Sequence, residues 1–158
     1  MKKIVTLTVN DKQHELALDS NETLADVLRE KIGLTGTKKG CELGDCGSCT
    51  VLLDGRPVNS CLVLAVQAAG KTVQTIEGLQ AGAELHALQQ AFVDKGAIQC
   101  GFCSPGMILS SHSLLEKNDH PGEEEIRRAI SGNLCRCTGY QKIVEAVQAA
   151  AETDLDPQ

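Results

Sequence analysis

The sequence predicts an α+β protein with a β-rich first half and an all-helical second half. Apolar and polar residues alternate from Lys3 onward, as expected for strands whose two faces differ. After Glu84, apolar residues recur every three or four positions, as expected for helices. A glycine- and alanine-rich stretch separates the two patterns and indicates a linker. The predicted division is a domain at residues 1–77, a linker at 78–83, a second domain at 84–152 and a loose tail at 153–158.

The first half is expected to form two hairpins and one helix. Two turn signals, Asn-Asp at 10–11 and Asp-Gly at 54–55, are flanked by short runs typical of strands. Ser20 or Asn21 can cap a helix that carries an apolar stripe and ends at Gly33. The expected elements are strands at 3–9, 13–18, 50–53, 56–58 and 71–76, a helix at 23–31, a glycine-rich loop at 36–48, and a helix or strand at 62–69.

The second half is expected to form a small four-helix bundle. Leu85, Leu88 and Phe92 share one helical face, and Ser104 with Pro105 suits the start of another helix. Three glutamates from residue 123 suit the positive end of a third helix, and two of them have arginines four residues later. The expected helices are residues 84–95, 104–117, 123–131 and 140–151.

The composition excludes several classes of partner. A net charge of −6 argues against nucleic acid, which requires a basic surface, and one Tyr, two Phe and no Trp leave no stacking platform for single strands. No run approaches the ~18 apolar residues of a membrane span. The N-terminus alternates in polarity and so differs from a signal peptide. A cytoplasmic protein is expected, and in that reducing compartment its eight cysteines are better explained as metal or redox ligands than as disulfides.

The first half contains one set of four cysteines with the spacing C-x4-C-x2-C and a fourth member eleven residues later: Cys41, Cys46, Cys49 and Cys61. This spacing is typical of plant-type 2Fe–2S ferredoxins. Such a cluster carries a formal charge of about −2, so it needs hydrogen-bond donors nearby. Gly40, Gly44 and Gly47 permit a tight loop whose backbone N–H groups supply them. Zinc is the alternative, but a zinc site does not require such a loop.

The second half contains the other set, spaced C-x2-C and then C-x-C: Cys100, Cys103, Cys135 and Cys137. Residues i and i+2 point about 200° apart on a helix, and a disulfide between them would be strained, so Cys135 and Cys137 need a common partner on irregular backbone. Each pair precedes a predicted helix, the second of which Thr138 or Gly139 could cap. Helix N-termini favour thiolates and an anionic cluster. On spacing alone, zinc remains an alternative at this set.

Taken together, the stretches KKGCELGDCGSCTV, QCGFCSPGM and GNLCRCTGY closely resemble the iron–sulfur subunit of the molybdenum hydroxylases, the xanthine dehydrogenase/aldehyde oxidoreductase family. The resemblance covers essentially the whole chain and all eight cysteines. It implies an N-terminal plant-type ferredoxin-like β-grasp domain followed by an all-α four-helix bundle domain, each binding one 2Fe–2S cluster. The implied ligands are Cys41, Cys46, Cys49 and Cys61 for one cluster, and Cys100, Cys103, Cys135 and Cys137 for the other.

The resemblance also implies partners. Members with separate small subunits pair with a large molybdenum–pterin subunit, most also have an FAD subunit, and a dimer of such heterotrimers is expected. Substrate is hydroxylated at molybdenum, and electrons pass through the helical-domain cluster, then the ferredoxin-like cluster, to flavin. No catalytic residue is expected in this chain. Gln99 and Cys137 are the residues that the resemblance places against the molybdopterin cofactor. A purine or another N-heterocycle is the expected substrate.

Two other functions are compatible with the residues, namely a stand-alone two-cluster ferredoxin and a structural zinc-binding module. Lys38 and Lys39 are interpreted as a solvated loop pair, with an effect on the charge of the first cluster as the alternative. Arg136 fits a donor toward the second cluster and a surface partner of an acid equally well. The four histidines show no ligand spacing and are interpreted as ordinary polar residues.

Overall fold

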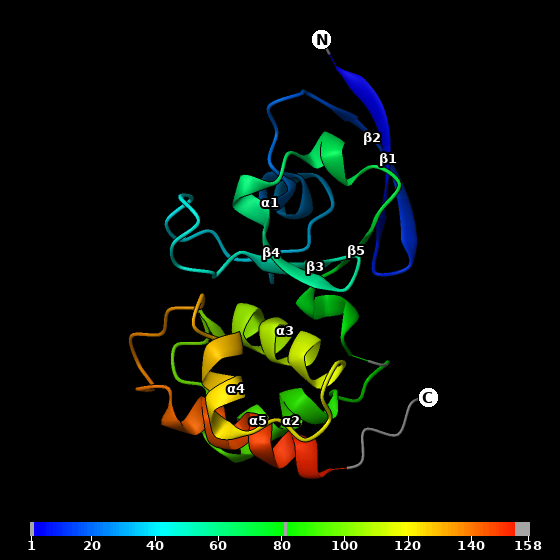
Figure 1. Ribbon diagram of the computed structural model, residues 1–158. Helices are drawn as coiled ribbons and strands as arrows, with labels where there is room; N and C mark the ends of the chain where they lie inside the picture. Colours follow the sequence, from blue (N-terminus) through cyan, green and yellow to red (C-terminus); the bar gives the residue numbers. More distant parts are fainter. Residues whose placement is uncertain (1, 81, 154–158) are drawn as a thin grey trace.

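The protein consists of a sheet and a helical half packed against each other in the computed structural model, which describes residues 2–80 and 82–153 (Figure 1). The α+β class is therefore confirmed. Part of the predicted linker and most of the predicted tail lie outside the described residues. In the described part, the strands form one five-stranded sheet in the order β2-β1-β5-β3-β4. The strands are β1 (Lys3–Val9), β2 (Lys12–Leu18), β3 (Thr50–Leu53), β4 (Arg56–Asn59) and β5 (Thr72–Gln74).

Both predicted hairpins are present. Asn10 and Asp11 have φ values of 49° and 62°, and Asp54 and Gly55 have φ values of 49° and 76°. Positive φ at both central residues is the geometry of the two-residue turns that match the twist of antiparallel strands. The hairpins β1–β2 and β3–β4 are antiparallel, and β5 joins them by pairing parallel to β1 and antiparallel to β3. The turn residues therefore predicted the positions of both hairpins.

The helix between the hairpins covers the inner face of the sheet. It is formed by α1 (Leu24–Asp26) and a π-helical turn (Val27–Lys31). The side-chain oxygen of Thr23 accepts from Asp26 N at 3.2 Å, so Thr23 caps the helix and the cap predicted at residue 20 or 21 is wrong. The predicted apolar stripe is confirmed, because each of its members is 0% exposed: Leu24, Val27 and Leu28.

The apolar run at 62–69 forms neither an α-helix nor a strand of the sheet. Only part of it is helical, in the two 3₁₀ turns Ser60–Leu62 and Ala65–Ala68. Leu24 N donates to Val63 O at 2.7 Å and Ala65 N donates to Glu22 O at 2.9 Å. The run is therefore held against the start of the helix, and these contacts decide its conformation more than its hydrophobicity does.

The helical half has its own apolar core. Its helices are α2 (Ala87–Asp94), α3 (Ser104–Leu115), α4 (Glu123–Ala129) and α5 (Gln141–Glu152). Leu88 and Phe92 are 0% exposed, but Leu85 is 45% exposed and does not belong to the predicted face. The helix starts after it because His86 Nδ1 accepts from Leu88 N at 3.2 Å and serves as the N-cap. The core is lined further by Met107, Ile126, Ile143, Val144 and Val147.

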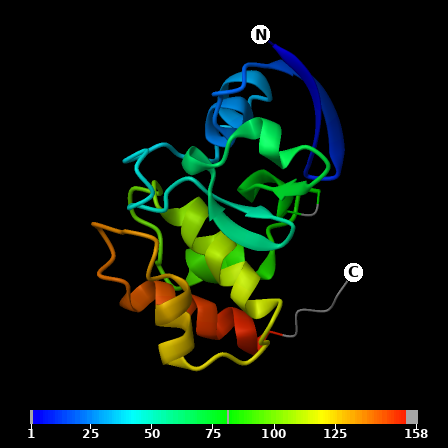
Figure 2. The same cartoon turned by 45° about the horizontal axis from the view of Figure 1, so that its top comes forward.

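Helix α3 joins the two halves. It runs beneath β3 and β4, which both views show (Figures 1 and 2). Ser113 Oγ donates to Gly55 O at 3.0 Å. An ideal Cβ on Gly106 would lie 2.5 Å from Gly47 O, so only glycine at this position of α3 allows the approach. The contact brings the N-terminal turn of α3 next to the loop that carries the first cysteine set.

Candidate metal centres

The first set of cysteines lies on a loop built around the sulfur of Cys41. We refer to residues 36–49 as the first cysteine loop. The backbone N–H groups of Leu43, Asp45 and Cys46 all donate to Cys41 Sγ, each at 3.3 Å. These hydrogen bonds lower the pKa of Cys41 to about 6, because they stabilise the thiolate. The loop therefore provides the donors that an anionic iron–sulfur cluster requires.

Glycines and one strained residue give the first cysteine loop its shape. Gly44 and Gly47 have φ values of 86° and 70°, and Glu42 also lies in the left-handed region at 56°. A Cβ on Gly40 would come within 2.8 Å of Cys46 Sγ, and one on Gly44 within 2.5 Å of the Leu62 side chain. The glycines therefore have the predicted role, because side chains at these positions would clash or be strained. The loop that they permit fits a 2Fe–2S group.

The remaining thiols of this set are buried against the sheet. Cys49 precedes β3 and is 3% exposed, whereas Cys61 lies in the 3₁₀ turn after β4 and is 8% exposed. Burial, together with a hydrogen bond that the protonated Cys61 thiol donates to the neighbouring Cys49, raises the pKa of Cys61 to about 11. One side of the first set is therefore dry and the other is open, because Cys41 and Cys46 are only half-buried.

The second set of cysteines is brought together from two loops that are far apart in the sequence. Cys103 is the N-cap of α3, and we refer to residues 130–140, which connect α4 to α5, as the C-x-C loop. Interactions between the thiols pair Cys103 with Cys135 and Cys100 with Cys137. Within residues 2–80 and 82–153, no three cysteine, histidine or acidic side chains surround a point suited to a single metal ion. Two pairs of thiols suit two irons, each with two thiolate ligands.

The two cysteines of the C-x-C loop lie in different surroundings. Cys135 is half-buried, and Thr138 contacts its sulfur through both its backbone N–H at 3.4 Å and its hydroxyl at 3.1 Å. Burial opposes ionisation of Cys135, but these hydrogen bonds outweigh it and lower its pKa. Cys135 N donates to Tyr140 Oη at 2.9 Å, so Tyr140 supports the loop. Cys137 is exposed.

Tyr140 also corrects the predicted start of the last helix. Its φ of 69° makes it the N-cap of α5, and its N–H donates to Thr138 Oγ1 at 3.2 Å. The predicted caps at Thr138 and Gly139 are thus displaced by one or two residues. The sequence missed the role of the tyrosine hydroxyl, since nothing in the local pattern indicates that an aromatic side chain folds back onto Cys135 N.

Gln99 and Arg136 lie beside the second set. Gln99 Nε2 donates to the carbonyl oxygen of Cys137 at 3.0 Å, so the glutamine holds the backbone of one cysteine while it is exposed itself. Arg136 is exposed, and within residues 2–80 and 82–153 it forms no ion pair. Both side chains are therefore exposed, Arg136 on the C-x-C loop and Gln99 in contact with it.

Direct hydrogen bonds connect the loops that carry the two sets. Leu134 N donates to Cys46 O at 2.8 Å. Cys46 belongs to the first set, and Leu134 immediately precedes Cys135 of the second set. Asn133 is 4% exposed, and its Nδ2 donates to Gly47 O at 2.9 Å and Thr50 Oγ1 at 3.1 Å. Its Oδ1 accepts from Ser110 Oγ at 2.8 Å. No local pattern predicts a role for Asn133, although its side chain connects the first cysteine loop to the C-x-C loop.

Replacement of Asn133 with alanine should loosen this connection. Ser110 Oγ would lose its partner in a buried site, whereas Gly47 O would keep a hydrogen bond from Thr50 Oγ1. We expect a loss of about 1–3 kcal/mol in the free energy of unfolding, because a buried polar group is left unsatisfied. Asn118→Ala is the control, since Asn118 is partly exposed and bonds to exposed Glu125, and it should change stability by about 0.5 kcal/mol or less. Equal losses for both variants in chemical denaturation would contradict the role of Asn133.

Comparisons with known proteins place the chain in a family. A 2Fe-2S iron-sulfur cluster binding domain matches residues 7–79, and a [2Fe-2S] binding domain matches residues 75–148. The nicotinate dehydrogenase small FeS subunit of Eubacterium barkeri is 49% identical over 153 residues, covering 96% of this chain and 98% of that protein. The chain belongs to the iron–sulfur subunits of the molybdenum hydroxylases. The resemblance seen in the cysteine motifs is therefore confirmed.

Other relatives agree with this membership. The xanthine dehydrogenase iron-sulfur-binding subunit of Escherichia coli O157:H7 is 45% identical over 154 residues, covering 94% of each chain. The structure of quinoline 2-oxidoreductase from Pseudomonas putida 86 superposes with a TM-score of 0.93 at 50% identity, covering 96% of this chain and 94% of that one. An iron–sulfur subunit of this family transfers electrons and is a non-catalytic part of an oxidoreductase. None of the helices in the described part of this subunit is long and apolar enough to span a membrane.

Proposed function

We propose that this subunit relays electrons from a molybdenum–pterin subunit to an FAD subunit through two 2Fe–2S clusters, each held by one of the two cysteine sets. The first cluster belongs to a β-grasp domain of the plant-ferredoxin type at residues 1–77, and the second to a four-helix domain at 84–152. When bound, a 2Fe–2S cluster accepts and releases one electron at a time. The proposed ligands are Cys41, Cys46, Cys49 and Cys61, and Cys100, Cys103, Cys135 and Cys137.

The observation that carries this proposal is the direct connection between the two cysteine loops. The hydrogen bond from Leu134 N to Cys46 O keeps a backbone segment of the second set in contact with a residue of the first. Cys41 Sγ accepts from three backbone N–H groups, whereas Cys135 Sγ is contacted by the N–H and the hydroxyl of one residue, Thr138. The first set also contains two buried thiols, whereas the second set contains two exposed ones. Hydrogen bonds to sulfur and solvent exposure set cluster potentials, so the two pockets are suited to two different potentials.

Exposed apolar side chains favour a partner complex over a stand-alone ferredoxin. Each of them is next to, or between, proposed ligands in the sequence. Leu43 is 73% exposed, Leu62 59%, Phe102 46% and Leu134 57%. Large apolar side chains in such a cluster of positions mark surfaces that another protein covers. We infer that the molybdenum–pterin subunit covers the exposed side of Cys100 and Cys137, with Gln99 and Cys137 against the pterin, and that the FAD subunit covers the side of Cys41.

The substrate of the complex is proposed to be an N-heterocycle. Relatives are named for nicotinate, caffeine and quinoline, which all contain a nitrogen heterocycle. A dimer of heterotrimers is the proposed assembly. The reducing cytoplasm is the proposed compartment, because none of the eight cysteines, all of which lie in the described part of the chain, forms a disulfide.

Metal and sulfide analysis of the anaerobically purified complex tests the proposal. We expect about four irons and about four labile sulfides per chain, two rhombic EPR signals after reduction with dithionite, and molybdenum and flavin in the co-purifying subunits. Nicotinate or another N-heterocycle should reduce both clusters. Zinc without labile sulfide would overturn the cluster assignment, and two clusters in a chain that purifies alone would support a stand-alone ferredoxin.

A further inference from the structure

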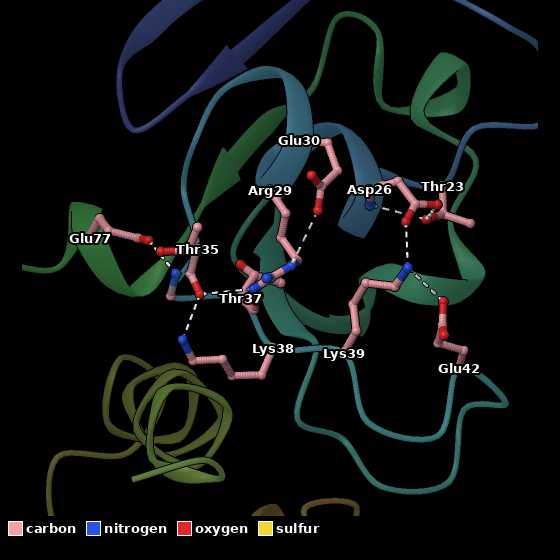
Figure 3. A network of polar contacts seen from close by, with 11 residues as sticks. Thr23, Asp26, Arg29, Glu30, Thr35, Thr37, Lys38, Lys39, Glu42 and Glu77 are labelled. Atoms are coloured by element: carbon pink, nitrogen blue, oxygen red, sulfur yellow. Dashed lines mark hydrogen bonds and ion pairs between the residues drawn. The ribbon is translucent and has the colours of Figure 1, made fainter.

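A three-residue ionic clamp spans the first proposed ligand. Lys39 Nζ lies 2.6 Å from Asp26 Oδ1 and 2.7 Å from Glu42 Oε1, so it bridges the helix and the first cysteine loop (Figure 3). Lys39 precedes Cys41 by two residues and Glu42 follows it by one. The interpretation of Lys39 as a solvated loop residue is therefore wrong, since its ammonium group is held between two carboxylates.

The base of this clamp is rigid. Asp26 Oδ2 accepts from Thr23 Oγ1 at 2.6 Å, and the helix that carries both residues is anchored by the fully buried stripe described above. The entry of the loop is fixed as well, because Arg29 Nη1 donates to Thr35 O at 3.1 Å and Thr37 O at 2.9 Å (Figure 3). The ionic clamp thus connects the core of the sheet half to the loop at a defined point.

The other end of the clamp is a residue in an uncommon conformation. Glu42 has a φ of 56°, which a residue with a Cβ adopts only where the surroundings hold it there. This conformation turns the backbone so that Leu43 N reaches Cys41 Sγ at 3.3 Å, followed by Asp45 N and Cys46 N at the same distance. Glu42 is therefore the residue from which the run of N–H donors starts.

We propose that Lys39 is a positioning residue that holds Glu42 so that the N–H groups around Cys41 stay aimed at its sulfur, and thereby raises the reduction potential of the first cluster. This inference rests on the proposed ligand set. Hydrogen bonds to the sulfur stabilise the more negative, reduced cluster, so their loss lowers the potential. A direct effect of the lysine charge is small, since two carboxylates neutralise it at contact distance.

Two substitutions with opposite changes in charge separate positioning from a direct field effect. Lys39→Met removes a positive charge and Glu42→Met removes a negative one, and neither methionine can form the contact between these two side chains. A field effect would shift the potential of the first cluster downward for the first variant and upward for the second. Positioning shifts it downward for both, because each variant breaks the clamp. The field of Glu42 itself is screened, since its side chain is 56% exposed.

The test is an EPR-monitored redox titration of the cluster-loaded full chain, with both cluster signals followed in each variant. We expect both variants to disfavour reduction of the first cluster on the order of tenfold, about 59 mV for a one-electron couple, and to leave the second cluster unchanged. Lys38→Met is the matched control, because its ammonium group bonds to Thr35 O at 2.7 Å outside the clamp and its charge change is the same. It should leave the first potential within a threefold change.

Each outcome decides the inference. Opposite shifts for the two variants, or no shift for either, would overturn it, as would an equal shift in Lys38→Met. If Lys39→Met fails to fold, Glu42→Met decides alone, and a downward shift supports positioning while an upward or absent shift does not. Failure of the proposed function is distinguishable, because the unaltered chain would then contain no iron or labile sulfide.

Discussion

Gly47→Ala is expected to destabilise the protein more than any other single methyl group added to the first cysteine loop. Gly47 has a φ of 70°, where alanine is strained by about 1–2 kcal/mol. The added Cβ would also overlap the backbone oxygen of Gly132 and lie 2.8 Å from Asn133 Nδ2. The Gly132 oxygen is backbone and the buried amide of Asn133 is held by three hydrogen bonds, so the two cysteine loops must separate. We expect a total loss of about 4 kcal/mol or more, which is exceptional for one substitution.

The conformational part of this loss has a matched control. Gly70 has a φ of 73°, but a Cβ there would meet no atom within 4 Å. Gly70→Ala should therefore lower the apparent thermal midpoint by roughly 2–6 °C, and Gly47→Ala by roughly 10 °C or more, as followed by circular dichroism. Equal midpoints for the two variants would show that the contact between the cysteine loops is not tightly packed.

The same substitution has a functional consequence. Separation of the loops would stretch the hydrogen bond from Leu134 N to Cys46 O, which is 2.8 Å long. The magnetic interaction between the two reduced clusters depends on their separation, so Gly47→Ala should weaken the splitting of the EPR signals, whereas Gly70→Ala should leave it unchanged. An unchanged splitting in a folded Gly47→Ala protein would mean that the clusters are positioned independently of this contact.

The elements that local sequence determines were predicted well. The Asn-Asp and Asp-Gly turns at 10–11 and 54–55 adopt positive φ, which those residue types tolerate best, and the flanking strands agree with prediction to within one residue. The glutamate–arginine pairs of α4 were also predicted, and Arg127 Nη2 lies 2.9 Å from Glu123 Oε1. Both features depend on neighbours within four residues, which the sequence displays directly.

Features that depend on distant contacts were not predicted. The cap of α2 is His86, whose Nδ1 serves as the acceptor only because the chain enters the helix at that residue. Asn133 and Gly47 are 86 residues apart, and no spacing rule connects them. Two adjacent lysines in a glycine-rich loop predict solvated side chains, which is wrong for Lys39. Its pairing with Asp26 depends on how the loop folds back over the helix.

Cys137→Ser should damage the second cluster and its coupling to the partner subunit together. Cys137 is exposed and lies beside Cys100, whereas Cys135 is half-buried and hydrogen-bonded by Thr138. The proposed function has Cys137 against the pterin, and its exposure leaves it accessible to a partner. In the complex, we expect a change or loss of the second rhombic EPR signal, an intact first signal, and reduction of the remaining clusters by substrate that is slowed at least about tenfold.

Gln99→Leu separates coupling from cluster assembly, because it leaves all eight cysteines in place. It removes the hydrogen bond from Nε2 to Cys137 O, which is 3.0 Å long. Loss of one hydrogen bond is worth about 1 kcal/mol. If the barrier to electron entry rises by that amount, substrate should reduce the clusters about fivefold more slowly while the iron content stays full.

Normal reduction of both clusters by substrate in Cys137→Ser would show that electrons enter the subunit elsewhere. The exposed side of Cys100 would then be the point to examine, since it is the other exposed thiol of the second set.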